Sequence, residues 1–128
     1  MITEKKLLVS DFERRKSDII KTINVENETI KIELYDNGEV DGDSISLFYN
    51  GKVILAHKRL FEKPIMVELP VDNDIENELV MYADNLGTIP PNTALMIVYD
   101  GKKRYEVYMT SDLRKSAVIR FRHKNNLD

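Results

Sequence analysis

The sequence contains no cysteine and no tryptophan, and its 128 residues include only two histidines, five glycines and four prolines. Without cysteine, the chain has no disulfide framework, thiolate catalysis, cysteine-ligated zinc site or iron–sulfur cluster. Two histidines are too few for a histidine-rich metal site. No apolar run approaches the roughly 18 residues that a membrane-spanning helix needs, so we expect no membrane insertion.

An excess of charge of one sign is also missing, because 19 basic residues stand against 22 acidic residues and the formal net charge is −3. This balance argues against nucleic-acid binding, which needs a basic surface. Hydrophobic residues make up 42% of the chain and charged residues 32%, a composition that excludes a disordered protein. The length suits one domain with a single core.

The first residues have only three consecutive apolar side chains after an acidic residue and two lysines, so we expect no signal peptide within this chain. A fragment of a longer secreted protein would look the same, which leaves the compartment open. Residues 1–21 are predicted as a helical or irregular lead-in. Leu8 and Phe12 stand four residues apart, as on a helix face, but Arg15 interrupts the stripe.

From Thr22 onward, apolar residues alternate with polar ones, as in Ile30, Ile32 and Leu34, which is the period of half-buried strands. Two runs are apolar without alternation, as expected for strands covered on both faces. Nine strands are predicted on this basis, over residues 22–25, 29–35, 44–49, 52–56, 65–69, 78–83, 93–99, 103–110 and 117–122.

Two dipeptides between predicted strands, Asn50-Gly51 and Asp100-Gly101, are typical of type I′ hairpin turns. Short strands joined by such turns, without helical stretches, predict an antiparallel β-sandwich of immunoglobulin-like type over residues 22–124, with a short tail at 125–128. A closed β-barrel is the alternative.

Residues 36–43 form an acidic loop with four carboxylates, one asparagine and two glycines. Oxygen ligands gathered on one loop are what calcium requires, so we predict a calcium site with Asp36, Asp41 and Asp43 as ligands. The spacing does not match an EF-hand. The alternative is two consecutive turns whose Asp and Asn side chains bond their own backbone.

A second long connection, residues 84–93, mixes prolines with asparagine and threonine. Loops at the ends of sandwiches often carry binding sites, which makes Asn85, Pro91 and Asn92 candidate binding residues. In the alternative, the two asparagines satisfy buried backbone groups of a connection between the sheets, and Ile89 plugs the end of the core.

Three aromatic side chains, Tyr35, Phe48 and Tyr108, are expected on solvent faces, where they could stack on sugars, form a partner interface or make ordinary cross-strand pairs. His57 and His123 lack metal-ligand spacing, and we expect both to be exposed and non-catalytic. No serine stands in the G-x-S-x-G motif, so a serine hydrolase is unsupported.

Several long strings of the sequence resemble a module found in uncharacterised proteins of Bacteroidetes. The strings are residues 32–51, residues 63–65, residues 82–96, which contain Asn-Leu-Gly-Thr-Ile-Pro-Pro-Asn-Thr-Ala, and residues 103–107. The resemblance covers roughly residues 12 to 122. Residues 110–117 depart from it and keep only the outline of a segment that often contains asparagine in relatives.

The resemblance implies an exported protein, located in the periplasm or at the cell surface. It also gives Asp43-Ser44-Ile45 a second meaning, because this tripeptide is similar to the acceptor motif for O-glycosylation of exported Bacteroidetes proteins. In that case Ser44 would carry a glycan. The alternative is an ordinary serine at the start of a strand.

The leading hypothesis is therefore a non-catalytic binding or structural sandwich module with a protein or glycan partner. The runner-up is a calcium-stabilised adhesion or glycan-binding module that uses the loop 36–43. No cofactor other than calcium is implied. An enzyme is the third hypothesis, because only the carboxylates of that one loop are clustered in the sequence.

Overall fold

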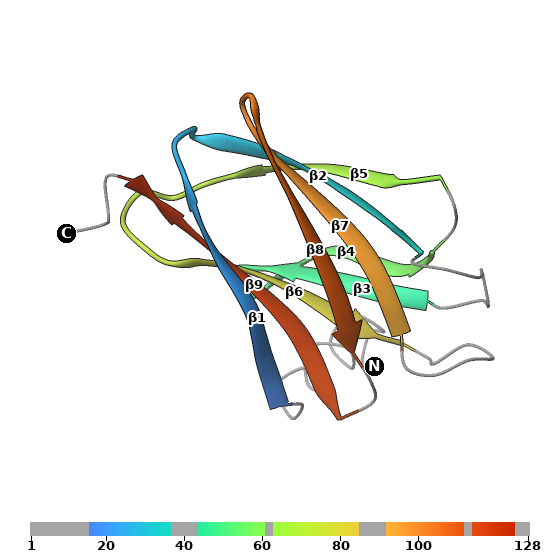
Figure 1. Ribbon diagram of the computed structural model, residues 1–128. Coiled ribbons are helices and arrows are strands. Elements are labelled where there is room, and N and C mark those ends of the chain that lie inside the picture. Colours follow the sequence, from blue (N-terminus) through green and yellow to red (C-terminus); the bar gives the residue numbers. More distant parts are fainter. Residues whose placement is uncertain (1–15, 37–43, 61–62, 85–91, 112–113, 125–128) are drawn as a thin grey trace.

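The computed structural model describes residues 16–36, 44–60, 63–84, 92–111 and 114–124, and its regular elements are nine strands (Figure 1). The strand predicted at residues 44–49 has the same bounds in the structure, and most of the other strands are one to three residues longer at an end than predicted. The strands are β1 (Lys16–Val25), β2 (Thr29–Asp36), β3 (Ser44–Tyr49), β4 (Lys52–Arg59), β5 (Ile65–Pro70), β6 (Asn77–Ala83), β7 (Asn92–Asp100), β8 (Lys103–Ser111) and β9 (Lys115–His123).

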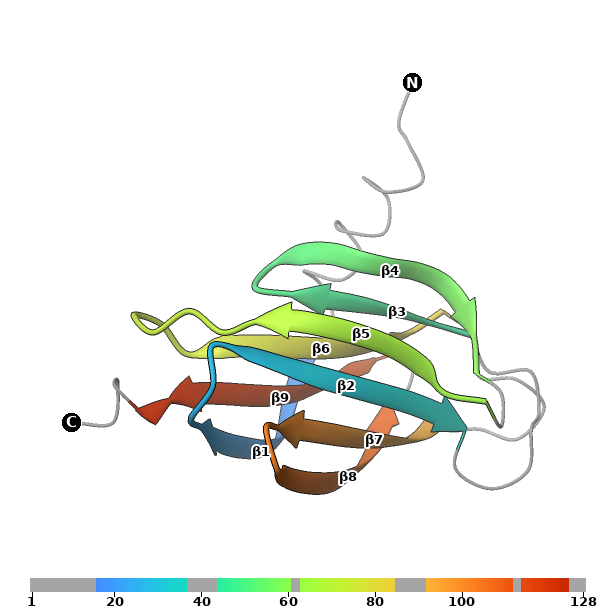
Figure 2. The ribbon, with the colours of Figure 1, turned by 90° about the horizontal axis from the view of Figure 1, so that it is seen from above.

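The strands form two sheets that pack face to face (Figure 2). The five-stranded sheet has the order β1-β9-β6-β3-β4, and the four-stranded sheet has the order β5-β2-β7-β8. All neighbouring strands are antiparallel except β1 and β9, which run parallel. The predicted β-sandwich is confirmed, and two separate sheets exclude the alternative of a closed barrel.

The prediction of a helical or irregular lead-in is wrong for residues 16–21, which belong to β1. These residues pair with β9 along the edge of the five-stranded sheet, from Lys16 opposite Lys115 onward. Their side chains are all exposed, so the backbone forms a strand without the apolar alternation that would predict one. Residues 1–15 and 125–128 lie outside the described residues.

The inward side chains of both sheets make one apolar core, which includes Met81, Met96 and Phe121. A second buried cluster lies on the outer face of the five-stranded sheet, where Phe48 meets Tyr82 edge to face with ring centroids 6.0 Å apart. The prediction of an exposed Phe48 is therefore wrong. The period of two gives its outward direction, but it does not tell whether that face is covered.

The turn prediction at Asn50-Gly51 is confirmed, because both residues have positive φ, at 51° and 82°, as a type I′ turn needs. The prediction at Asp100-Gly101 is wrong by one residue. Asp100 is a strand residue opposite Lys103, so Gly101 and Lys102 form the centre of the turn. Of these two only Gly101 has positive φ, the pattern of a Gly-X type II′ turn.

The even-numbered strands β2, β4, β6 and β8 end at one end of the sandwich, where the odd-numbered strands β3, β5, β7 and β9 begin (Figure 2). This arrangement brings the last residue of β2 and the residue after β6 to the same end of the molecule. The acidic loop, residues 36–43, and the proline-containing connection, residues 84–93, both start at this end.

Candidate functional site

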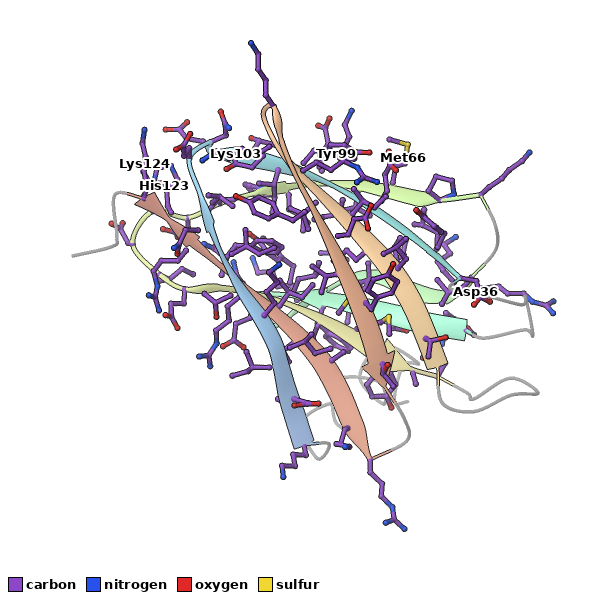
Figure 3. All side chains as sticks on the ribbon, viewed as in Figure 1. Asp36, Met66, Tyr99, Lys103, His123 and Lys124 are labelled. Carbon is purple, nitrogen blue, oxygen red and sulfur yellow. The ribbon has the colours of Figure 1, made fainter. Side chains whose placement is uncertain are left out.

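Of the three predicted calcium ligands, only Asp36 is among the described residues, and Asp41 and Asp43 lie outside them. Asp36 ends β2 opposite Ala94, on the inward side of the strand, and its side chain is buried. Its carboxylate thus lies at the end of the core (Figure 3). Within the described ranges, no three His, Cys, Asp or Glu side chains are grouped to hold a metal ion. Calcium binding stays a prediction.

The predicted binding residues of the second connection are mostly outside the described part of the chain, which omits Asn85 and Pro91. Asn92 begins β7, and its backbone lies opposite Ser111 of β8. A role for these residues in binding stays a prediction.

Ser44, the predicted glycosylation residue, belongs to a polar cluster around Asp84 that joins β3, β4 and the end of β6. The Ser44 hydroxyl donates a hydrogen bond to Asp84 Oδ2 at 3.2 Å, and the Ser46 hydroxyl donates to Asp84 Oδ1 at 3.0 Å. His57 Nδ1 lies 3.2 Å from Asp84 Oδ2, and the His57 N–H donates to Ser46 Oγ at 3.0 Å. No local sequence pattern predicts this cluster, because its members are separated by up to 40 residues.

The cluster contains the residue types of a hydrolase triad in a different arrangement. In a triad the imidazole stands between the serine and the carboxylate and takes the serine proton. Here both serine hydroxyls donate directly to the Asp84 carboxylate, and Ser46 is completely buried. The hydrogen bonds therefore join β3, β4 and the end of β6. His57, whose φ is 53°, lies where the register between β3 and β4 shifts.

The two histidines differ in exposure. His57 is solvent-exposed, as expected, beside Asp84. His123 is buried, and the prediction of an exposed side chain is wrong. It is the last residue of β9 and lies two residues after Phe121, so its side chain points to the same inward side of the strand. Val25, at the end of β1, is its partner in the neighbouring strand.

A groove of about 380 Å³ lies on the outer face of the four-stranded sheet, and we call it the outer groove. Figure 3 shows Tyr99 and Met66 on this face. Tyr99 is the last residue of a continuous apolar run, and such a run does not tell which side chains point outward. The sequence pattern therefore does not predict Tyr99 as a surface residue. The side chains that line the outer groove come from β2, β5 and β7: Thr29, Lys31, Glu33, Met66, Glu68 and Tyr99.

Strand register brings these side chains together in rows across the sheet. Lys31 of β2 lies between Glu68 of β5 and Tyr99 of β7. In the next row, Glu33 lies beside Met66, whose side chain is 56% exposed. Neighbouring strands are about 4.8 Å apart, so the aromatic ring, the ammonium group and both carboxylates share one small surface.

Tyr99 lies opposite Arg104 of β8. Arg104 donates a hydrogen bond to Glu106 Oε1 at 2.6 Å, and Glu106, with a smaller contribution from Tyr99, raises the pKa of the Arg104 guanidinium. Arg104 and Glu106 are exposed. An arginine side chain therefore lies beside Tyr99 at the rim of the outer groove.

The other two predicted aromatics of the four-stranded sheet lie on the same outer face. Tyr108 of β8 is 59% exposed, which confirms its prediction, and Tyr35 of β2 is half-buried. Both lie in one row on either side of Leu95. The outer face therefore carries three tyrosines, of which Tyr99 alone lines the outer groove.

Comparisons with protein-family models, with curated proteins and with solved structures give no match for this chain. In the part of the chain that the structure describes, no helix has the length and hydropathy needed to cross a membrane.

Proposed function

We propose that this chain is a non-catalytic binding module of an exported protein and that its outer groove binds a neutral carbohydrate. The exported location follows from the resemblance to Bacteroidetes modules. The observation that supports binding is the position of the Tyr99 ring beside Lys31 and Glu68 in a groove on the sheet face.

The chemistry of the outer groove suits a sugar ring. The face of a tyrosine ring packs against the C–H groups of a pyranose, and its apolar area is large. Carboxylates of Glu33 and Glu68 accept hydrogen bonds from sugar hydroxyls, and the Lys31 ammonium donates to them. A volume of about 380 Å³ lies at the lower end of the range for small-ligand sites.

The charge of the outer groove favours a neutral ligand. Two carboxylates, on Glu33 and Glu68, stand against the single ammonium of Lys31 in its lining. An anionic sugar or a phosphate would meet a surplus of negative charge at close range. The groove therefore disfavours uronic acids and nucleic acids.

The first prediction is that calorimetric titration with neutral tetrasaccharides of glucose, xylose, mannose and N-acetylglucosamine finds at least one ligand. Tyr99→Ala weakens this binding by about tenfold, or ~1.4 kcal/mol, because the stacking surface is lost. Tyr99→Phe keeps the ring and most of the affinity.

Tyr108→Ala is the matched control, since this tyrosine is on the same outer face and does not line the outer groove. It should bind as the unmodified protein does. Absence of binding to every neutral tetrasaccharide, or equal affinity of the Tyr99→Ala protein, would show that the outer groove is not the carbohydrate site.

A further inference from the structure

The described strands of the two sheets contact each other along one side of the sandwich, which we call the closed side, and we call the side along β4 and β5 the open side. On the closed side, β8 contacts β9 and β6 of the opposite sheet, and the Lys21 ammonium lies 5.8 Å from the centre of the Tyr105 ring. On the open side, the five-stranded sheet ends at β4 and the four-stranded sheet ends at β5 (Figure 2).

A groove of about 570 Å³ lies on this open side, and we call it the inter-sheet groove. Tyr49 and Ile54 line it from β3 and β4, and Val67, Leu69 and Val71 line it from β5 and the residue that follows. Pro70 completes its apolar lining, and its polar lining residues are Asn50, Lys52, Glu68, Asp72 and Asn77. The outer groove lies on the opposite face of β5, and Glu68 lines both grooves.

The core is incomplete beside the inter-sheet groove. The inward side chains Ile65 and Val67 of β5 are only partly buried, whereas Ile32 and Leu34 on the adjacent strand β2 are fully buried. On the other wall, Ile54 is 36% exposed. Apolar surface of this kind between two sheets favours an additional apolar occupant.

The backbone edges beside the inter-sheet groove show what kind of occupant fits. Within the described residues, β5 pairs only with β2, so the N–H and C=O groups of its second edge have no strand partner there. An extended peptide satisfies such groups, and a lipid or another apolar small molecule does not.

The two edges are not equally suited to a new strand. β4 has two register shifts against β3, a left-handed residue at His57, and three basic residues, Lys52, Lys58 and Arg59, which are features that protect an edge. β5 pairs with β2 over six consecutive positions without a shift and carries no basic residue. Its length before Pro70 accepts about five residues, or ~16 Å of extended chain.

We propose that an extended segment of a partner polypeptide adds to the four-stranded sheet as a new strand along β5. Its backbone pairs with Ile65–Leu69, and alternate aliphatic side chains fill the inter-sheet groove against Tyr49, Ile54 and Val67. The main chain supplies affinity, and the alternating side chains supply specificity. The proposal does not rest on carbohydrate binding in the outer groove, although Glu68 lines both grooves.

A fluorescently labelled peptide of alternating valine and threonine tests this proposal by anisotropy with the full chain. The peptide should bind, and the same peptide with a central proline should not, because proline removes a ladder donor. Ile54→Lys should weaken binding by about tenfold, since it places a charge in the inter-sheet groove. Ile54 is exposed enough for the variant to fold, which circular dichroism would verify.

Ile75→Lys is the matched control, because Ile75 is 43% exposed and lies outside the inter-sheet groove. This variant should bind the peptide as the unmodified protein does. Bound peptide should also slow hydrogen exchange of the β5 amides. Absence of binding, equal affinity of the Ile54→Lys protein, protection of β8 instead of β5, or self-association of the chain through β5 in sedimentation would overturn the proposal.

Discussion

Asn77 joins several segments by hydrogen bonds at the end of the sandwich where β6 begins. Its side chain is completely buried, and Nδ2 donates to the carbonyls of Phe121 and Asp72 at 3.2 and 3.0 Å. Its Oδ1 accepts from the Asp72 N–H and from Asn50 Nδ2, both at 3.0 Å. One amide group thereby joins β6, β9 and two turns.

The second prediction is that Asn77→Ala lowers the free energy of unfolding by about 2–4 kcal/mol, because several buried backbone groups lose their partner at once. Urea unfolding would measure it. Asn24→Ala is the control, because the side chain of Asn24 on β1 is exposed, and it should change the free energy of unfolding by less than about 0.5 kcal/mol. Equal effects of the two substitutions would refute the structural role of Asn77.

Tyr49 supplies the third prediction, which concerns pH. Its hydroxyl donates to the Pro70 carbonyl, and burial, with a contribution from Asp72, raises its pKa from 10.0 to about 12. The unfolded chain therefore releases this proton at lower pH than the folded chain. The stability that Tyr49 contributes is complete below pH 10.0 and is lost as pH rises toward about 12.

We expect this loss to be about 1–2 kcal/mol once solvent screening is allowed for. Urea unfolding across this pH range, compared with Tyr49→Phe, isolates the effect because phenylalanine keeps the ring and cannot ionise. The stability difference between the two proteins should shrink or reverse at high pH. A constant difference would contradict the assignment.

At the scale of elements, the two glycine turns give a matched pair for the fourth prediction. Gly51 has a φ of +82°, and among the described atoms nothing lies within 4 Å of where its Cβ would be. Gly101 has a φ of +60°, and its Cβ would lie 2.8 Å from Asn27 Nδ2, which donates to Asp100 Oδ1 at 2.6 Å.

Gly51→Ala should cost about 1 kcal/mol, from backbone strain alone. Gly101→Ala should cost about 2–3 kcal/mol, because Asn27 must also move away from Asp100. Thermal unfolding of both proteins measures the difference. In an Asn27→Ala background the extra cost should disappear, and its persistence there would show that the contact is not its source.

The elements also show how far sequence patterns reach. Alternation places the inward residues of strands such as β2 correctly, because burying one face requires a period of two. The same rule fails for residues 16–21, whose side chains are all exposed, and for Phe48, whose outward side chain is covered. The period of two indicates which side of a strand is apolar, and it predicts neither strand nor burial where both sides have similar side chains.

At the scale of the whole molecule, the sandwich follows from many short alternating strands, but the pairing of strands does not. β1 and β9 are nearly a hundred residues apart along the chain and yet lie side by side in parallel. The outer groove depends on such pairings, since Lys31, Glu68 and Tyr99 are brought together only by the order β5-β2-β7. No local pattern contains that information.

The measurement that tests the proposed function most directly is an NMR titration of isotopically labelled protein with the neutral tetrasaccharide that binds most tightly. We expect the largest chemical-shift changes at Lys31, Glu33 and Tyr99, whose side chains line the outer groove. Changes confined to the polar cluster around Ser44 and Asp84, or no change with any neutral tetrasaccharide, would contradict carbohydrate binding in the outer groove.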